Sequence, residues 1–249
     1  MESVFEIAKK HLQGNDAEFF QRVWNQDLTV YENRIKAIDF KGMTNVLDAG
    51  FGVGQWLVNL AKLNNRVYGI EYSPERVAAV ESIIKRLGVG NCNLQQGSIE
   101  SLPYEDSFFD AIFCYGVIFL TDVRKSLKEF QRVLKPGGKL YISVSGLGWF
   151  TMLIIEEKNK SEAYDPRRAA MEAIENTIFY LEDETITPGQ QVIIPSKLIS
   201  RYLQELGFNN TIIDGDGKIN ITNQKNVISF YQKEYLGNEF VYELLTQKK

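Results

Sequence analysis

The sequence has a single histidine, His11, and only two cysteines, Cys92 and Cys114, among 249 residues. One histidine leaves no His pair or Cys/His cluster for zinc and no local Ser/His constellation for acyl transfer, which excludes metal and serine hydrolases. Each cysteine lies in an apolar run, so we expect two reduced core thiols. The sequence therefore predicts no metal site and a reducing compartment.

An excess of one charge and long apolar runs are also missing. Lys and Arg number 28 against 32 Asp and Glu, for a net charge of -4, so no general basic field attracts nucleic acid or an anionic membrane. No apolar run approaches the length of a membrane span, and MESVFEIAKKHLQGND lacks the basic-then-apolar order of a signal peptide. We expect a cytoplasmic monomer or homodimer without nucleic-acid or membrane partners.

The hydrophobic content of 44% is ample for the core of one large domain. From residue 44, short apolar strands alternate with helices, which predicts an α/β protein with a mainly parallel sheet. The expected strands are 44–49, 66–71, 91–96, 109–115 and 138–145, with two more around 209–214 and 239–245. We expect one domain in four parts: an N-terminal helical cap (1–43), a core (44–145), a cap insertion (146–195) and a C-terminal helix with strands (196–249).

Capping signals predict where three helices begin or end. Ser73 and Gly88 suit the two ends of a helix after the second strand. A helix that begins near Asp122 is expected to stop at Pro136, and Ser196 is expected to cap the last helix.

Aromatic residues gather in the two parts expected to cap the sheet. Helical spacing over 3–12 and 16–38 predicts a helical prefix, and a second helix is expected to begin at Asp165 and Pro166 in the insertion. Prefix aromatics either pack in the core or cover a site; they are Phe19, Phe20, Trp24 and Tyr31. The insertion adds six residues that suit an apolar or aromatic small molecule: Trp149, Phe150, Met152, Tyr164, Phe179 and Tyr180.

The stretch VLDAGFGVGQW, residues 46–56, places Gly50, Gly52 and Gly54 directly after the first strand. In a crossover unit this loop lies at the carboxyl edge of the sheet, where open α/β folds bind ligands, and glycine lets a ligand approach the main chain. The dinucleotide fingerprint fails because Gln55 stands where it needs glycine or alanine, and no Lys-Ser or Lys-Thr pair completes a phosphate loop. This register argues against a nicotinamide dehydrogenase and favours a nucleoside without a buried pyrophosphate.

Two carboxylates flank the glycine loop. Glu71 ends the second strand, where an acidic side chain accepts both hydroxyls of a ribose. Asp48 ends the first strand, and it either binds a ligand ammonium, orients the loop by accepting backbone N–H bonds, or does both.

Four stretches, in this order and spacing, resemble the class I S-adenosylmethionine-dependent methyltransferases: VLDAGFGVGQW, VYGIEYSPERV, QQGSIESLPYEDSFFDAIFCYGVIFLTD and EFQRVLKPGGKLYIS. The resemblance is strong over about residues 44 to 145. It implies a Rossmann-like, mostly parallel seven-stranded sheet with a reversed final strand and helices on both faces. It also implies S-adenosyl-L-methionine as the cofactor at the carboxyl edge, and a substrate that enters beneath variable caps.

The resemblance implies roles for individual residues as well. Gly50, Gly52 and Gly54 would line the methionine moiety of the cofactor, Glu71 would hold its ribose, and Tyr72 would lie beside its adenine.

Further along the chain, Ser98 stands where the family often has an aspartate, and it would accept the adenine amino group without charge assistance. Ile99 would offer its backbone N–H to the ring. Tyr115 and Gly116 match the segment that faces the methyl donor, so Tyr115 joins Asp48 among the expected cofactor-binding residues. Phe119 stands where many relatives carry histidine, which weakens the case for an inherited catalytic base.

We expect an enzyme that moves a methyl group to an oxygen or nitrogen atom of a small-molecule acceptor by in-line displacement, mainly through positioning. Where the acceptor must lose a proton, His11 and Tyr115 are the candidates to receive it, although a surface or capping place suits His11 better. Two alternatives remain open. An RNA or protein methyltransferase would need a basic surface or an added recognition domain, and a catalytically silent cofactor-binding scaffold would account for Ser98 and Phe119.

Overall fold

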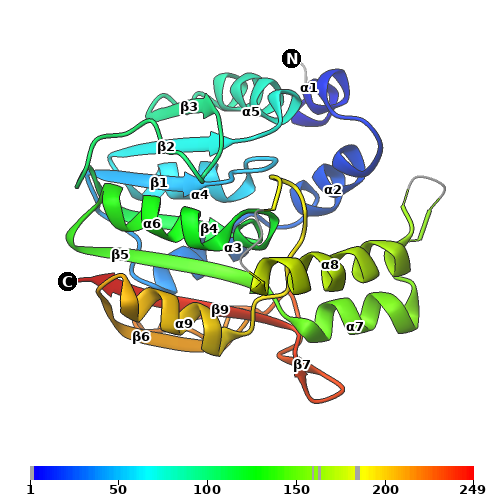
Figure 1. The fold of residues 1–249 in the computed structure, drawn as a ribbon. Coiled ribbons are helices and arrows are strands. Elements are labelled where there is room, and N and C mark those ends of the chain that lie inside the picture. The colour runs from blue at the N-terminus through cyan, green and yellow to red at the C-terminus, as the bar shows by residue number, and fades with distance from the viewer. Residues whose placement is uncertain (1–2, 159, 162–163, 183–185) are drawn as a thin grey trace.

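The computed structural model describes residues 3–158, 160–161, 164–182 and 186–249, and within them a seven-stranded sheet forms the centre of the molecule (Figure 1). The strand order is β3-β2-β1-β4-β5-β9-β6. The first five strands are parallel, whereas β9 runs antiparallel to both β5 and β6. The strands are β1 (Asn45–Ala49), β2 (Arg66–Glu71), β3 (Cys92–Gln96), β4 (Phe109–Tyr115), β5 (Leu134–Ser145), β6 (Phe208–Gly215) and β9 (Val241–Lys248). This is the expected Rossmann-like α/β fold with a reversed final strand.

Helices cover both faces of the sheet, and the sheet separates two hydrophobic cores, one on each face (Figure 1). One face carries α3 (Thr29–Ala37), α4 (Gln55–Leu63) and α5 (Pro74–Leu87), and the other carries α6 (Val123–Val133) and α9 (Ser196–Glu205). Successive side chains of a strand point to opposite faces, so β4 contributes to both cores. Phe113 packs in the core beneath α3, α4 and α5, and its neighbours Ile112 and Cys114 pack in the core beneath α6 and α9. Because β4 is covered on both sides, its sequence FDAIFCY is almost continuously apolar.

The N-terminal prefix is helical, as expected, but it forms three helices: α1 (Val4–His11), α2 (Gly14–Trp24) and α3. The expected helix over 16–38 is interrupted before Thr29. Asp27 accepts hydrogen bonds from the backbone N–H and the hydroxyl of Thr29, a local turn that competes with helix.

The described residues of the insertion form two helices, α7 (Leu147–Glu156) and α8 (Pro166–Leu181), which pack side by side beyond the carboxyl ends of the parallel strands (Figure 1). The start of α8 is confirmed, since the Asp165 side chain accepts the N–H groups of Arg167 and Arg168. The sequence missed α7 because LGWFTMLIIE is apolar on nearly every side and shows no helical period.

Several predicted boundaries differ from the structure. Ser73 and Gly88 bound α5 as predicted, and Asp122 caps α6, but α6 ends at Val133 and Pro136 lies inside the longer strand β5. The β4–β5 register shifts at this point, which accommodates a proline within a strand.

The prediction that Ser196 caps α9 is also wrong. The cap position belongs to Pro195, and the Ser196 hydroxyl instead bonds the carboxylate of Glu239. Glu239 belongs to a small two-stranded sheet of β7 (Glu234–Tyr235) and β8 (Asn238–Glu239), so the last strand of the large sheet, β9, begins later than predicted. A short 3-10 helix also spans Ile118–Leu120. Throughout the described residues, every helix is too short or too polar to cross a membrane.

Candidate active site

A cavity of about 880 Å³ lies at the carboxyl ends of the parallel strands. Its volume falls in the upper part of the roughly 300–1,000 Å³ range of small-molecule sites. At one end it is lined by the glycine loop and by Glu71, at the end of β2; at the other end it is lined by Trp149 and Met152 of α7 and by Tyr235 and Phe240. Phe230 also lines the cavity, with its ring 6.2 Å from that of Trp56. The cavity therefore joins the predicted cofactor loop to the aromatic insertion.

The glycines of the loop have different surroundings. Gly50 and Gly52 line the cavity, and both have positive φ angles, of 83° and 55°. A Cβ atom on Gly50 would lie 2.5 Å from the Val117 side chain, whereas one on Gly52 would meet nothing within 4 Å. Gly54 faces Val80 and begins α4. Of the three, Gly52 offers the most open approach to the main chain.

The Glu71 carboxylate holds the glycine loop in place. It accepts the Gly52 N–H at 3.0 Å and the Ser73 N–H at 3.0 Å, and it lies 3.5 Å from the Arg76 guanidinium. A carboxylate has about four lone-pair sites, so these bonds leave capacity to accept further donors from a ligand. The loop-orienting bond that the sequence suggested for Asp48 is made by Glu71.

Asp48 lies beneath the loop with only 1% of its surface exposed. Its Oδ2 atom has no hydrogen-bond partner among the described residues. Burial, together with the nearby Glu71 carboxylate, raises the pKa of Asp48 well above its usual range. An uncharged Asp48 fits this apolar position better than an ionised one.

We expect this burial to appear in the pH dependence of stability. Because the pKa of Asp48 is higher in the folded protein than the value near 4 of an unfolded chain, the stabilisation from its bound proton is complete below about pH 4 and is lost as the pH rises toward the folded pKa. Asp48→Asn removes this titration. Between about pH 4 and about pH 8, the free energy of unfolding of the variant should rise relative to that of the unaltered protein. Denaturant unfolding at both pH values measures the gain, and a difference that does not change with pH would contradict it.

Some of the other predicted site residues line the cavity, and others lie outside its lining. Tyr115 lines the cavity, whereas His11 lies on α1 with its Nε2 atom 3.4 Å from the Ser82 hydroxyl of α5. The position of His11 therefore does not support a catalytic role. In the described part of the chain, five predicted cofactor residues lie outside the cavity lining, and their roles remain predictions: Asp48, Gly54, Tyr72, Ser98 and Ile99.

Two of these residues have surroundings that bear on those roles. Tyr72 is 62% exposed beside Glu71, so its ring is free to cover a ligand at the rim. The Ser98 hydroxyl accepts the Glu100 N–H at 3.1 Å, and its own proton remains available for donation.

Sequence reasoning missed several residues that line the cavity. Gln55 and Trp56 form the first turn of α4, and the Gln55 Oε1 and Trp56 Nε1 atoms are buried without a hydrogen-bond partner among the described residues. Their place directly behind the glycines is a usable signal in the sequence, because Gln55 is a polar group at the loop as well as a departure from the dinucleotide fingerprint. Phe230 and Tyr231 carried no local signal at all.

The chain resembles known proteins in sequence over its central part. Residues 47–142 match the family described as "Methyltransferase domain". The chain is 35% identical over 109 residues to the uncharacterized methyltransferase YcgJ of Bacillus subtilis, covering 43% of each chain. It is 32% identical over 144 residues to a demethylmenaquinone methyltransferase of Bacillus cytotoxicus, covering 55% of this chain and 58% of the relative. The chain thus spans about half the length of the curated relatives it matches.

Solved structures share the fold over almost the whole chain. A S-adenosylmethionine-dependent methyltransferase from Aquifex aeolicus aligns with a TM-score of 0.58 at 17% identity and full coverage of both chains. Geranyl diphosphate methyltransferase in complex with S-adenosylmethionine gives a TM-score of 0.63 at 12% identity, covering 95% of this chain and 93% of that one. The ordered motifs, the matched domain and the sheet with its reversed strand agree: residues 47–142 are similar to a methyltransferase domain, and the chain has the fold of solved S-adenosylmethionine-dependent methyltransferases.

Proposed function

We propose that this protein transfers a methyl group from S-adenosyl-L-methionine to an oxygen or nitrogen atom of a small-molecule acceptor. The observation that carries this proposal is one continuous cavity lined by Gly52 and Glu71 and also by Trp149 and Tyr231. Donor and acceptor must meet for a direct displacement, and one continuous chamber allows this meeting.

The glycine-loop end fits the cofactor. Gly52 has open space where a side chain would stand, Glu71 retains acceptor capacity for ribose hydroxyls, and Gln55 and Trp56 bring buried polar atoms that need partners. When bound, the cofactor supplies a methyl group that the positive charge on its sulfur already activates. The residues of the chain then have to bind, orient and exclude water.

The opposite end is built from aromatic side chains. Trp149 lies with its ring centroid 5.6 Å from that of Tyr231 and 5.3 Å from that of Phe240, and the ring of Tyr235 is 6.2 Å from Phe240. Such walls suit an apolar or flat small molecule with few polar groups. The names of the demethylmenaquinone and geranyl diphosphate relatives indicate small molecules as acceptors for those proteins, which supports the same class here.

Positioning accounts for the expected rate better than a dedicated base. His11 lies away from the cavity, and the Tyr115 hydroxyl is bound to the Asp216 carboxylate at 2.8 Å. Burial raises the pKa of Tyr115 well above its usual range, so it remains a neutral phenol. Well-oriented reactants reach effective molarities of about 10⁵–10⁸ M without a base.

Calorimetry with purified protein measures binding of the cofactor. An assay with labelled methyl groups then measures transfer to a panel of phenols, alcohols and amines. We expect binding of S-adenosylmethionine and transfer to at least one class. A protein that binds neither the cofactor nor its demethylated product would refute the proposal. Tight binding without transfer across the panel would favour the silent scaffold, and salt-sensitive binding of RNA would favour a macromolecular substrate.

A further inference from the structure

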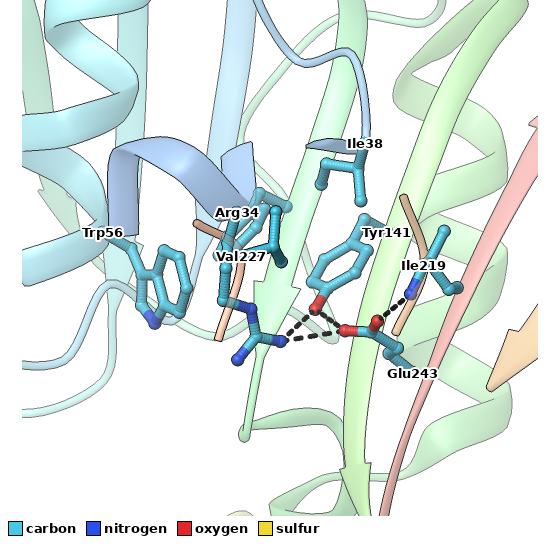
Figure 2. A pocket seen from close by; sticks show the side chains of 8 residues that line it. Arg34, Ile38, Trp56, Tyr141, Ile219, Val227 and Glu243 are labelled. Atoms are coloured by element: carbon cyan, nitrogen blue, oxygen red, sulfur yellow. Dashed lines mark hydrogen bonds and ion pairs between the residues drawn. The ribbon is translucent and has the colours of Figure 1, made fainter. Parts of the chain in front are cut away.

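A buried group of charged and phenolic side chains lies beside the cavity, and we call it the Arg34 cluster. It consists of Arg34 from α3, Tyr115 from β4, Tyr141 from β5, Glu243 from β9, and Asp216, which follows β6. The Arg34 guanidinium points to the Tyr141 hydroxyl and the Glu243 carboxylate (Figure 2). Its Nη2 atom lies 2.7 Å from Asp216 and 2.9 Å from Glu243, and the three charged side chains are at most 4% exposed.

The hydrogen bonds of the cluster define its charge. Asp216 accepts from the Tyr115 hydroxyl at 2.8 Å and from the N–H groups of Phe230 and Tyr231 at 2.6 and 3.1 Å. Glu243 accepts from the Tyr141 hydroxyl and from the Ile219 N–H. Every one of these partners is a donor, which suits ionised carboxylates because they can only accept.

One guanidinium therefore faces two carboxylates. Burial raises the pKa of Tyr115 and of Tyr141 well above the usual range, which keeps both phenols neutral. The Arg34 cluster carries a net charge of -1 in a part of the protein that excludes water.

Tyr115 connects this charge to the wall of the cavity. Its side chain lines the cavity while its hydroxyl binds Asp216. β4 pairs with β1, which leads into the glycine loop, and Tyr231, held by Asp216, contacts Trp149 of the aromatic end. The Arg34 cluster therefore meets the cavity through Tyr115 and through Tyr231, which both line it.

The other charged residues of the lining do not supply a comparable field. Arg76 lies 3.5 Å from Glu71 and 2.7 Å from Asp16, and the Arg76 and Asp16 side chains are 34% and 31% exposed, so solvent screens the charge of this group. Glu156 lies 3.6 Å from Lys158, and this pair is close to neutral. Arg22 is exposed, and solvent and salt screen its charge. Within the described residues, the Arg34 cluster is thus the most deeply buried charged group beside the cavity.

We propose that the Arg34 cluster selects the positively charged cofactor, S-adenosylmethionine, over its neutral demethylated product, S-adenosylhomocysteine. This inference rests on the proposed function, which brings that cofactor to the cavity. The two molecules differ by the methyl group and by one positive charge, and a buried anionic cluster attracts only the charged form. Loss of the methyl group removes this attraction, so the same residues that favour binding of the donor favour release of the product.

Calorimetric affinities for both molecules test the proposal. In Asp216→Asn, which removes the negative charge and keeps the shape, the ratio of the two affinities should move against S-adenosylmethionine by about tenfold. The affinity for S-adenosylhomocysteine should stay the same. An equal loss of affinity for both molecules would overturn the inference. Asp216 would then only position Phe230 and Tyr231.

Glu243→Gln provides a second arm, because it removes the same charge without touching the Phe230–Tyr231 backbone, and it decides the question if Asp216→Asn fails to fold. Glu205→Gln is the matched control, since its carboxylate is 64% exposed, and the ratio should not change. In the unaltered protein, the ratio should resist added salt; a ratio that collapses at high salt would assign the selection to exposed charges. Absence of binding by the unaltered protein would refute the proposed function itself.

Discussion

Replacing Gly52 with valine is expected to lower the affinity for S-adenosylmethionine by at least about 100-fold. Gly52 lines the cavity, and a side chain built on it would enter space that no described atom occupies within 4 Å. In the proposed complex the cofactor fills that space, so two methyl groups and the ligand would compete for it. Titration calorimetry measures the loss.

Backbone strain has to be separated from this steric effect, because Gly52 has a φ of 55° that a β-branched residue adopts at a cost of about 1–2 kcal/mol. Gly14 is a matched control: its φ is 52°, its Cβ position is equally open, and it is exposed at the start of α2, outside the cavity lining. Gly14→Val should lose similar stability and bind the cofactor normally. If Gly52→Val binds the cofactor normally, the placement of the cofactor beside Gly52 is wrong.

Local patterns in the sequence were sufficient for the cofactor end of the site. Gly50 and Gly52 lie in one loop, and Glu71 ends the neighbouring strand, so the alternation of strands and helices already places the three together. Local spacing could not tell which of the two carboxylates, Glu71 or Asp48, binds the glycine loop. Glu71 holds the loop while Asp48 is buried without doing so, because that outcome depends on side-chain direction at the strand ends.

The Arg34 cluster was beyond local pattern for a different reason. Arg34 and Glu243 are 209 residues apart, and each belongs to an element whose sequence gives it no special context. Arg34 occurs in an amphipathic prefix where a basic residue ordinarily faces solvent. Only the reversed strand β9, paired beside β5, brings Glu243 to the face that α3 covers.

Removal of the Arg34 side chain is expected to give the largest loss of stability of any variant considered. Burial alone would lower the pKa of Arg34, but its partners, Tyr141 and Tyr115 with Asp216 and Glu243, raise it well above the usual range, so the guanidinium stays charged. Arg34→Met leaves two buried carboxylates without their cation, which costs about 3–5 kcal/mol in comparable sites. The guanidinium also lies 4.9 to 5.5 Å from the rings of Phe230, Tyr115 and Trp56, and these contacts are lost as well.

Denaturant unfolding measures this loss, and a double variant gives its cause. Arg201→Met is the control for a lost surface arginine, since Arg201 is 66% exposed beside Glu205, and it should change stability by less than about 1 kcal/mol. If the cost arises from unpaired charge, Glu243→Gln should be less harmful in the Arg34→Met background than in the unaltered protein, because it then removes a carboxylate that has lost its partner. Additive effects of the two changes would instead attribute the loss to packing around α3, and the cluster would then lack the strong internal coupling that a buried net charge of -1 requires.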